Sequence, residues 1–522
     1  QATPWACIAA IAAYALQRPV KLVLKRHDDM RFTGKRHPYS SDYKIGLDES
    51  GKILAYDVTY YQNSGAVADL SPAIMERSLF HSTNTYYVPN VRVTGLCCKT
   101  NLPPFTAFRG FGGPQAMFVM EAAIAKAAES AGFDTIDVQQ KNLLSDGDQF
   151  PYGMCVEKSN AERSFLLCKE KYEYDLLLNG VTEFNSINET QKRGISMMPI
   201  CFGISFTKTM LNQAGALVHI YTDGSVAVST GVVEMGQGVN TKIISIAART
   251  FGIPPEKIII ENTNTTRVAN TSPTAASSGA DLNGMAAQMA CKAVLGRLKK
   301  VAANSLEVNE NTITVKDGDI YCSNTKTDLG WKQLVSEAYC SRTNLTAQAF
   351  YATPNLHYDD DKERGTPFAY HVFGAAITEV TVDCIRGTYT IDAVHVVHDA
   401  GESLNLLIDK GQTEGALLQG IGWMTIEELI YGASGELTTN SLATYKVPDL
   451  HFVPKAVNVE FLKDAANPHA VMQSKAIGEP PFMYGIGSYF AIMNALKAYR
   501  PEKPAFYNAP LTPEKALSFL HR

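Results

Sequence analysis

The chain has 522 residues, of which 45% are hydrophobic and 19% are charged, and its formal net charge is −5. This length exceeds one ordinary hydrophobic core and predicts a globular protein of two to four units. The charge gives no electrostatic reason to expect nucleic acid or a membrane surface as a partner, and no apolar run reaches the roughly 18 residues of a membrane helix.

Ten cysteines are present, but no two of them form a Cys-x-x-Cys pair. A sequence without such pairs offers neither a zinc site nor an iron–sulfur cluster of its own. Free thiols are typical of a reducing compartment, so we expect a cytoplasmic protein. The Ala-rich stretch 5–16 has helical character, but it is short and lacks a basic leader, which argues against a signal peptide.

Strand-like and helix-like segments alternate along the chain, which predicts mixed α/β layers. The first elements in chain order are a helix at 5–16, strands at 21–24 and 43–46, a hairpin turn at 49–51, a strand at 53–61 and a helix at 114–131. Residues 140–195 are polar and irregular, so we interpret them as a surface-exposed connection to the second half.

A sharper pattern begins at Ala216. Alternating apolar residues on both sides of Asp223-Gly224 predict a β-hairpin with a favoured turn. A helix at 239–251, a short buried strand at 258–260 and a helix at 283–303 are expected to follow. The apolar stripe of the last helix is predicted to contain Met285, Met289, Leu295 and Leu298.

A second hairpin is predicted at 377–382 and 389–397, divided by Arg386-Gly387 and followed by a helix at 411–421. The order hairpin, glycine-bearing loop and helix therefore occurs twice, which suggests an internal duplication. A last helix runs through Tyr489 to Ala498. The sequence between these segments contains no Pro/Gly linker, so we expect the units to pack tightly.

Glu479 is the most informative single residue, because it stands between a glycine and the pair Pro480-Pro481. Both prolines have φ fixed near −65° and lack an N–H. Since proline disfavours helical geometry in the residue before it, Glu479 is predicted to be extended, just ahead of a helix. A carboxylate fixed in this way suits a proton acceptor. The alternative is an acid that caps the helix, and position alone favours that alternative.

Four glycine-bearing loops precede helices, at 107–115, 234–238, 271–279 and 474–482. Each loop alone is readily explained by tight turns and close packing. Together they predict several helix N-termini that converge on a large anionic group. The Gly110-Phe111-Gly112 stretch is a poor dinucleotide fingerprint, because no clean strand precedes it and a proline starts the helix early.

The sequence contains no Walker A, HExxH or GxSxG motif. His395 and His398 are the one close histidine pair, but their odd spacing on a strand points them to opposite faces. We therefore expect the protein to supply no direct metal ligand, so that any metal is held by a group that brings its own ligands.

The residues of these loops resemble the molybdopterin-binding portion of the xanthine dehydrogenase/oxidase family. The matching segments read TAFRGFGGPQ at 106–115, EMGQG at 234–238, SPTAAS at 272–277 and KAIGEPP at 475–481, and MERSLF at 75–80 is similar to a further family segment. They occur in family order over most of the chain, so the chain is identified as a bacterial-type large subunit or a fragment of one.

The resemblance implies an α+β or mixed α/β, multi-domain architecture of the xanthine dehydrogenase/aldehyde oxidase type. Residues 1–205 would be the remainder of a first molybdopterin-binding domain. Residues 206–522 would be a second, with two similar halves at 206–374 and 375–522.

The implied activity is that of a molybdenum hydroxylase, which oxidises hypoxanthine and xanthine to urate by inserting a water-derived oxygen at a purine carbon. The metal of this family is held by the dithiolene sulfurs of the pterin, which fits the missing side-chain ligands. Glu479 would be the general base that deprotonates the metal-bound hydroxyl as it attacks the carbon.

The resemblance also assigns substrate-binding residues. Arg77 would donate to a purine oxygen and stabilise charge that develops on the ring. Phe111 and Phe206 would enclose the purine, one face-on and one edge-on, and Thr207 would add a hydroxyl donor. Without the resemblance, Arg77 reads as a surface arginine and the two phenylalanines as core residues.

A further set of residues resembles the family's cofactor contacts. Arg109 would act through its main chain, Gln237 through its side-chain amide, and Ala276 would line the metal side. The complete set is Arg109, Met235, Gly236, Gln237, Ala276, Ser277, Ser278 and Gln412.

Aldehyde oxidase is the nearest competitor within the superfamily. It lacks the Pro-Pro pair after the catalytic acid, replaces the purine arginine and differs in the SPTAAS loop. This chain has the xanthine dehydrogenase version of all three, which favours purines. The alternatives are a molybdenum hydroxylase of aldehydes or other N-heterocycles, and a cofactor-free scaffold subunit.

The family pattern also contains parts that are not matched here. A glycine-rich loop and a second acid precede the segment that matches Gln1, and the FAD and 2Fe–2S portions belong to the same enzymes. We expect these on a missing portion or a partner chain, and we expect the isolated chain to be unable to turn over alone. The complete enzyme is expected to be a dimer.

Overall fold

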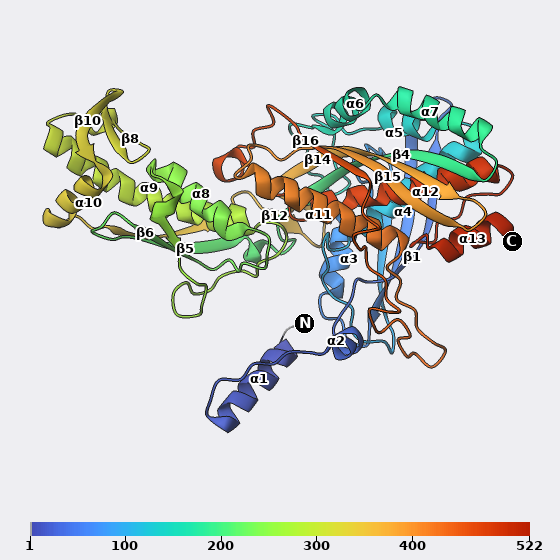
Figure 1. Cartoon of the computed structure of the whole chain (residues 1–522), viewed down its shortest axis with the longest axis horizontal. Coiled ribbons are helices and arrows are strands. Elements are labelled where there is room, and N and C mark those ends of the chain that lie inside the picture. Colours follow the sequence, from blue (N-terminus) through green and yellow to red (C-terminus); the bar gives the residue numbers. More distant parts are fainter. Residues whose placement is uncertain (1–2) are drawn as a thin grey trace.

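The computed structural model describes residues 3–522, so the first two residues of the predicted first domain lie outside the described part. The chain has a mixed α/β fold, as predicted, and Figure 1 shows two lobes. The smaller lobe contains β5, β6, β8, β10, α8, α9 and α10, and the larger lobe contains β1, β4, β14, β15 and β16. The helix predicted at 5–16 is confirmed as α1 (Thr3–Leu16), which stands away from the body and buries none of its described side chains.

The first sheet has the order β1-β2-β3. Its strands are β1 (Tyr39–Leu47), β2 (Ile53–Gly65) and β3 (Val91–Lys99). The hairpin turn predicted at 49–51 is confirmed: β1 and β2 pair antiparallel, and Asp48 Oδ1 accepts from the N–H groups of Ser50 and Lys52 at 2.8 and 2.9 Å. The helices of this unit are α3 (Ser71–Phe80), between β2 and β3, and α4 (Gly113–Ala131), the helix predicted at 114–131.

The strand predicted at 21–24 is wrong, because these described residues form coil. Leu22 and Val23 are 42% and 73% exposed, so the apolar residues of this stretch bury little surface. The helix that follows is α2 (Arg26–Phe32).

The second sheet has the order β11-β5-β6-β7 and forms the smaller lobe. Its strands are β5 (Gln213–Ile220), β6 (Val226–Thr230), β7 (Ile258–Ile260) and β11 (Thr346–Ala352), and its main helices are α8 (Val239–Phe251) and α9 (Gly279–Leu306). The predicted hairpin around Asp223-Gly224 is confirmed by the antiparallel pairing of β5 with β6. The predicted helices and the strand at 258–260 are confirmed as well.

The apolar stripe predicted for α9 is wrong in part. Met289 is 43% exposed, whereas the fully buried face consists largely of small residues such as Ala286 and Ala290. Close approach explains this choice, because a Cβ built on Gly284 would lie 2.6 Å from Ile246 of α8. Large side chains therefore do not fit on the face where α9 meets α8.

The third sheet has the order β16-β15-β14-β4. Its strands are β4 (Gln191–Ile204), β14 (Tyr370–Asp383), β15 (Thr388–His398) and β16 (Ala456–Phe461). The helix α11 (Leu406–Thr425) follows β15, and α12 (Ile486–Tyr499) follows the short 3₁₀ helix η5 (Pro480–Gly485). The second predicted hairpin is confirmed by the antiparallel pairing of β14 with β15. β4 also pairs with β14, so this sheet joins strands from both sides of residue 205.

Each of the three sheets described above contains the same unit. An antiparallel hairpin leads into a helix, and the next strand returns parallel to the second strand of the hairpin. The units are β1-β2-α3-β3, β5-β6-α8-β7 and β14-β15-α11-β16. The sequence pattern predicted this order twice, and the first sheet adds a third occurrence. Duplication as its origin remains a hypothesis.

The interpretation of residues 140–195 as an irregular connection is wrong. They contain α6 (Ala161–Lys171) and α7 (Tyr174–Ile187), which cover one face of the third sheet, where Phe165 packs with Met197. On the opposite face Phe202 packs with Ile492 of α12. Only a narrow stripe of α6 and α7 is buried, and the polar remainder of both helices hid the pattern from the sequence.

The remaining elements are short. They are α5 (Thr135–Lys141), α10 (Trp331–Cys340), α13 (Pro513–His521), β8 (Ile313–Lys316), β9 (Asp319–Cys322), β10 (Thr325–Gly330), β12 (His357–Asp359) and β13 (Arg364–Thr366). Within residues 3–522 the longest helices are not apolar enough, and the apolar ones are not long enough, to cross a membrane.

A buried ion pair joins the two lobes beside the start of two helices. Lys242 of α8 lies 2.5 Å from Asp409 of α11, and both side chains are at most 9% exposed. Asp409 also accepts a hydrogen bond from Ser403 at 2.6 Å. The N-terminal ends of α8 and α11 are therefore held side by side, and the loops that precede these helices are held with them.

A buried carboxylate lies inside the larger lobe. Glu121 of α4 is 2% exposed and accepts hydrogen bonds from Asn84, Tyr86 and Gln139, each at 2.8 Å. Burial raises the pKa of Glu121 to about 7, although these three donors act to lower it. The folded state therefore binds the Glu121 proton more tightly than the unfolded state, whose carboxyl has the ordinary pKa of 4.5.

We predict that Glu121 makes the protein less stable as the pH rises. The stabilisation from its proton is complete below pH 4.5 and is lost by about pH 7. Glu121→Gln cannot ionise and preserves the shape of the side chain. Its unfolding midpoint in urea should therefore rise relative to that of the unmodified protein as the pH increases from 5 to 8. Glu129→Gln, an exposed change on the same helix, is the control. An identical pH slope for Glu121→Gln and the unmodified protein would contradict the assignment.

Candidate functional site

Glu479 does not adopt the extended conformation predicted for it. Its φ and ψ are −106° and −42°, in the helical region, and it directly precedes the 3₁₀ helix η5 (Pro480–Gly485). The Phe482 N–H donates to the Glu479 carbonyl at 3.0 Å, and this turn overrides the preference that proline imposes on its predecessor. The Glu479 side chain makes no capping bond to this helix, so it is free for another role.

The segment before Glu479 is anchored by buried polar contacts. Lys475 Nζ lies 2.5 Å from Asp399 Oδ2 and donates to the His371 carbonyl at 2.9 Å. The Ala476 N–H donates to the hydroxyl of Tyr370 at 2.9 Å. These contacts with β14 and the end of β15 fix the backbone that presents Glu479.

Two loops distant in sequence hold the Glu479 carboxylate. The Gly110 N–H donates to Oε1 at 3.1 Å, and Ser277 Oγ donates to Oε2 at 3.0 Å. Each carboxylate oxygen thus has one donor, and the side chain is half-buried. This arrangement fixes the direction of a carboxylate while leaving its remaining lone pairs available.

Arg109 connects the same site to α11. Its Nε donates to the Gly478 carbonyl, and its two terminal nitrogens lie 3.3 Å from Gln419 Oε1 and 3.2 Å from Gln412 Oε1. Sequence analysis assigned a main-chain role to Arg109, and in the structure its side chain also brings Gln412 to the Glu479 loop. The Arg109 carbonyl accepts a hydrogen bond from Arg36, a residue that sequence analysis did not identify.

The loop 234–238 is largely exposed and bonded to itself. Met235 is 67% exposed, and its N–H donates to Gln237 Oε1 at 2.5 Å. The Gln237 Nε2 donates to the Val233 carbonyl at 2.8 Å. The amide of Gln237 must exchange these local bonds if it is to hold a ligand.

Glu234 organises this loop, and sequence analysis missed it as a site residue. Its carboxylate accepts from the N–H groups of Gly236 and Gly238 at 2.9 Å and of Asn240 at 3.0 Å, at the start of α8. Burial acts to raise the pKa of Glu234, but the main-chain donors outweigh it and lower that pKa. An acid followed by two glycine N–H groups before a helix is the sequence signal that points to it.

The loop 271–279 carries two strained residues. Ala276 and Ser277 have φ of +55° and +56°, a left-handed conformation that costs a non-glycine residue about 1 kcal/mol. Ser277 is the donor to Glu479, and Ser278 is buried at the start of α9. The Val233 N–H donates to Thr274 Oγ1 at 2.9 Å, so this loop also meets the loop 234–238.

Arg77 is only 1% exposed and holds a main-chain segment. Its terminal nitrogens donate to the carbonyls of Gly203, at 2.8 Å, and of Ser205. The guanidinium carbon lies 5.1 Å from the ring centres of both Phe202 and Phe368. Burial lowers the pKa of Arg77, while the charges of Glu479 and Glu76 oppose that shift.

The predicted substrate residues follow this segment. Phe206 and Thr207 come directly after Ser205, and the main chain of Phe206 bonds to Asn212 through its N–H, at 2.8 Å, and its carbonyl, at 2.9 Å. Phe206 and Phe111 are half-buried and Thr207 is 9% exposed. Phe111 has φ of +49°. It directly follows Gly110, whose N–H donates to the Glu479 carboxylate.

Open space adjoins three glycines, two of them on the helix of Gln412. A Cβ built on Gly411 or Gly415 of α11, or on Gly236, would meet no atom within 4 Å. The surrounding polar groups are amides, hydroxyls and a guanidinium, which bind oxygen-rich and anionic organic groups. Within the described residues no three His, Cys, Asp or Glu side chains gather as a possible metal site. The polar groups beside Gln412 fit an oxygen-rich, anionic organic group such as a molybdopterin.

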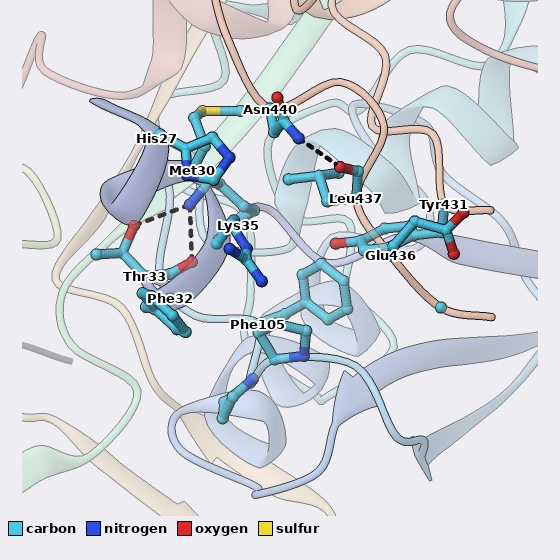
Figure 2. Close-up of a pocket in the computed structure, with 14 residues that line it drawn as sticks. His27, Met30, Phe32, Thr33, Lys35, Phe105, Tyr431, Glu436, Leu437 and Asn440 are labelled. Atoms are coloured by element: carbon cyan, nitrogen blue, oxygen red, sulfur yellow. Dashed lines mark hydrogen bonds between the residues drawn. The ribbon is translucent and has the colours of Figure 1, made fainter. Parts of the chain in front are cut away.

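A cavity of about 380 Å³ lies away from this site, between α2, the segment 103–105 and the loop 431–440 (Figure 2). Figure 2 shows Lys35 beside Thr33, and Lys35 Nζ donates to the Thr33 carbonyl and Oγ1 at 2.7 and 2.8 Å. Burial lowers the pKa of Lys35. The cavity contains none of the predicted site residues, so volume alone does not identify the site.

Comparisons with known proteins identify the family of the chain. Residues 1–143 and 167–454 each match the model of a molybdopterin cofactor-binding domain. The chain is 43% identical over 499 residues to a xanthine dehydrogenase of Dictyostelium discoideum, covering 95% of this chain and 35% of that protein. It is 42% identical over 513 residues to the xanthine dehydrogenase/oxidase of Mus musculus, covering 97% and 37%. The chain thus spans about a third of the length of the curated relatives it matches.

Solved structures share the fold. Quinoline 2-oxidoreductase from Pseudomonas putida 86 matches with a TM-score of 0.87 at 20% identity, covering 98% of this chain and 66% of that chain. Aldehyde oxidoreductase from Desulfovibrio gigas matches with a TM-score of 0.84 at 24% identity, covering 99% and 52%. At these identities the likeness supports the fold alone.

Proposed function

The chain belongs to the molybdopterin cofactor-binding family, as the molybdopterin-binding portion of the xanthine dehydrogenase/oxidase type, and from this premise we propose that it is the catalytic portion of a molybdenum hydroxylase. The observation that carries the proposal is the Glu479 carboxylate, held by Gly110 and Ser277 where its own loop meets the loops 107–115 and 271–279. A fixed carboxylate at the convergence of these loops is suited to proton transfer beside a bound cofactor.

The proposed reaction oxidises hypoxanthine and xanthine to urate. At each step one C–H bond of the purine breaks, one C–O bond to a water-derived oxygen forms, and two electrons and two protons leave. The molybdenum cofactor, when bound, supplies the centre that accepts the two electrons. Glu479 takes a proton from the attacking oxygen, and its two hydrogen bonds keep the carboxylate aimed without reorganisation at that moment.

The other site residues bind and orient. We propose that Met235, Gly236, Gln237, Ala276, Ser277, Ser278, Gln412 and Arg109 hold the cofactor. Phe111 and Phe206 would enclose the purine, and Thr207 would donate to it. Arg77 is proposed to face the purine from the remaining side, and its clamp on the carbonyls of Gly203 and Ser205 supports a further role in holding the segment that carries Phe206.

The purine specificity rests on the similarity to xanthine dehydrogenases at 41–43% identity. We further propose that FAD and 2Fe–2S portions receive the electrons, that the complete enzyme is a dimeric cytoplasmic protein, and that the chain divides near residue 205 into two cofactor-binding domains. The alternative is a hydroxylase of aldehydes or other N-heterocycles, on the same fold.

Metal analysis combined with substrate comparison tests the proposal. In the complete enzyme we expect molybdenum in a 1:1 ratio to this chain, and turnover of xanthine and hypoxanthine well above that of aromatic aldehydes. Stoichiometric molybdenum with preferential aldehyde turnover would select the alternative. Absence of molybdenum from protein isolated under cofactor-sufficient conditions would leave only a scaffold role.

A further inference from the structure

One peptide group lies between Arg36 and Glu479. The Arg109 carbonyl accepts from Arg36 Nη2 at 2.7 Å, and the N–H of the same peptide, on Gly110, donates to Glu479 Oε1 at 3.1 Å. In a trans peptide the C=O and the N–H point in opposite directions. The two hydrogen bonds therefore hold the peptide plane from opposite edges, with the cation on one side and the carboxylate on the other.

The Arg36 side chain is itself held by aromatic rings. Its guanidinium carbon lies 4.5 Å from the ring centres of Phe108 and Phe482 and 5.1 Å from that of Trp423. These rings come from the loop before α4, from η5 just after Glu479, and from α11. Contacts of this kind bind a guanidinium face-on and leave its edge free to donate hydrogen bonds.

The peptide needs such a clamp because it precedes a glycine. Gly110 has φ of +89°, and glycine populates positive and negative φ about equally. Local sterics therefore do not select one orientation of the peptide. In the reversed orientation the Arg109 carbonyl oxygen would face the Glu479 carboxylate, which is electrostatically unfavourable.

Three arginines interact with the Glu479 charge. They are Arg36 in the segment before β1, Arg77 in α3 and Arg109 in the loop before α4. Arg36 also interacts with the charges of Glu427 and Tyr445. Burial lowers the pKa of Arg36 to about 9, which leaves the guanidinium charged at neutral pH.

We propose that Arg36 is a positioning residue for Glu479: by holding the Arg109 carbonyl it keeps the Gly110 N–H directed at the carboxylate. This inference rests on the proposed role of Glu479 as the base. In this role Arg36 acts through the main chain of the loop, and not by contact with substrate or cofactor.

The test uses the complete, molybdenum-loaded enzyme. Arg36→Met should lower kcat for xanthine about 10- to 100-fold, since misplacing a catalytic group has effects of this size. KM should change less than about threefold, because binding is not removed. Arg36→Lys keeps a cation at this place and should recover part of the lost kcat.

A second readout does not depend on turnover. Amide hydrogen exchange of the loop 105–115 should increase in Arg36→Met, measured without cofactor. Arg31→Met, which removes an exposed arginine on α2, is the control and should change neither readout. A normal kcat, or a lower kcat with unchanged exchange of the loop, would overturn the inference.

The double variant separates this inference from the proposed function. If Glu479 is the base, Arg36→Met should add no further loss in a Glu479→Gln background, and additive losses would overturn the positioning role. If Glu479→Gln alone retained near-normal turnover, the proposed base would be wrong. Increased loop exchange in Arg36→Met would then still support the clamp on the peptide.

Discussion

Replacing Glu479 with glutamine in the complete enzyme should lower kcat for xanthine about 10²- to 10⁴-fold, the usual contribution of a positioned general base. Glutamine preserves the size of the side chain and can accept from Gly110 or Ser277 through its carbonyl oxygen, but it does not take a proton. The loss should therefore appear in turnover, and molybdenum content and the thermal unfolding transition should stay close to those of the unmodified enzyme.

Steady-state turnover with metal analysis on the same preparation checks this result. Glu402→Gln, which changes an exposed glutamate in the same part of the chain, is the matched control and should leave kcat unchanged. Near-normal turnover of Glu479→Gln with stoichiometric molybdenum would show that another group accepts the proton. A variant without molybdenum would instead assign Glu479 to cofactor retention.

Arg77→Met should destabilise the protein by about 2–4 kcal/mol. The change leaves the carbonyls of Gly203 and Ser205 without a donor in a buried place, at about 1–3 kcal/mol for each unsatisfied group. Methionine retains apolar contact with Phe202 and Phe368, so the loss arises chiefly from the missing hydrogen bonds. Chemical unfolding followed by near-ultraviolet circular dichroism measures it.

The control is Arg193→Met, an exposed arginine whose guanidinium lies 4.1 Å from the ring centre of Phe184, and its effect should stay below about 1 kcal/mol. Equal effects of the two changes would contradict the clamp. Substrate preference separates the clamp from the proposed purine contact. A purely structural role lowers purine and aldehyde turnover together, whereas a purine contact lowers purine turnover far more.

The sequence predicted the elements whose periodicity is strong and local. The hairpin at Asp223-Gly224, α8 and the hairpin of β14 with β15 follow from alternation and turn residues, which act over a few positions. It failed where burial depends on distant partners. The polar surfaces of α6 and α7 concealed their narrow buried stripes, and the close approach of α8 selected small residues on α9.

For the candidate site, too, the sequence predicted some features and not others. Motif resemblance assigned the loops that carry Glu479 and Ser277 and the loop 107–115 to one site, and the structure joins these loops through the hydrogen bonds of Gly110 and Ser277 to Glu479. It did not find Arg36, which lies outside the matching segments, and it gave no role to Glu234, although Glu234 begins the segment EMGQG. Both side chains act on main-chain groups rather than on a ligand. The conformation of Glu479 was also missed, because the turn that follows it outweighs the local effect of proline.

The wide sequence separation of the groups around Glu479 has a consequence for how the protein acquires its activity. The two donors to its carboxylate lie 369 and 202 residues away along the chain, and both precede Glu479. During synthesis the lobe built on β5 and β6 is complete before Glu479 has left the ribosome. Contacts of such long range form late, since closing long loops precedes any gain from them. The arrangement around Glu479 is therefore complete only when the whole chain has folded. A cofactor that met a partly synthesised chain would find only some of the loops proposed to bind it.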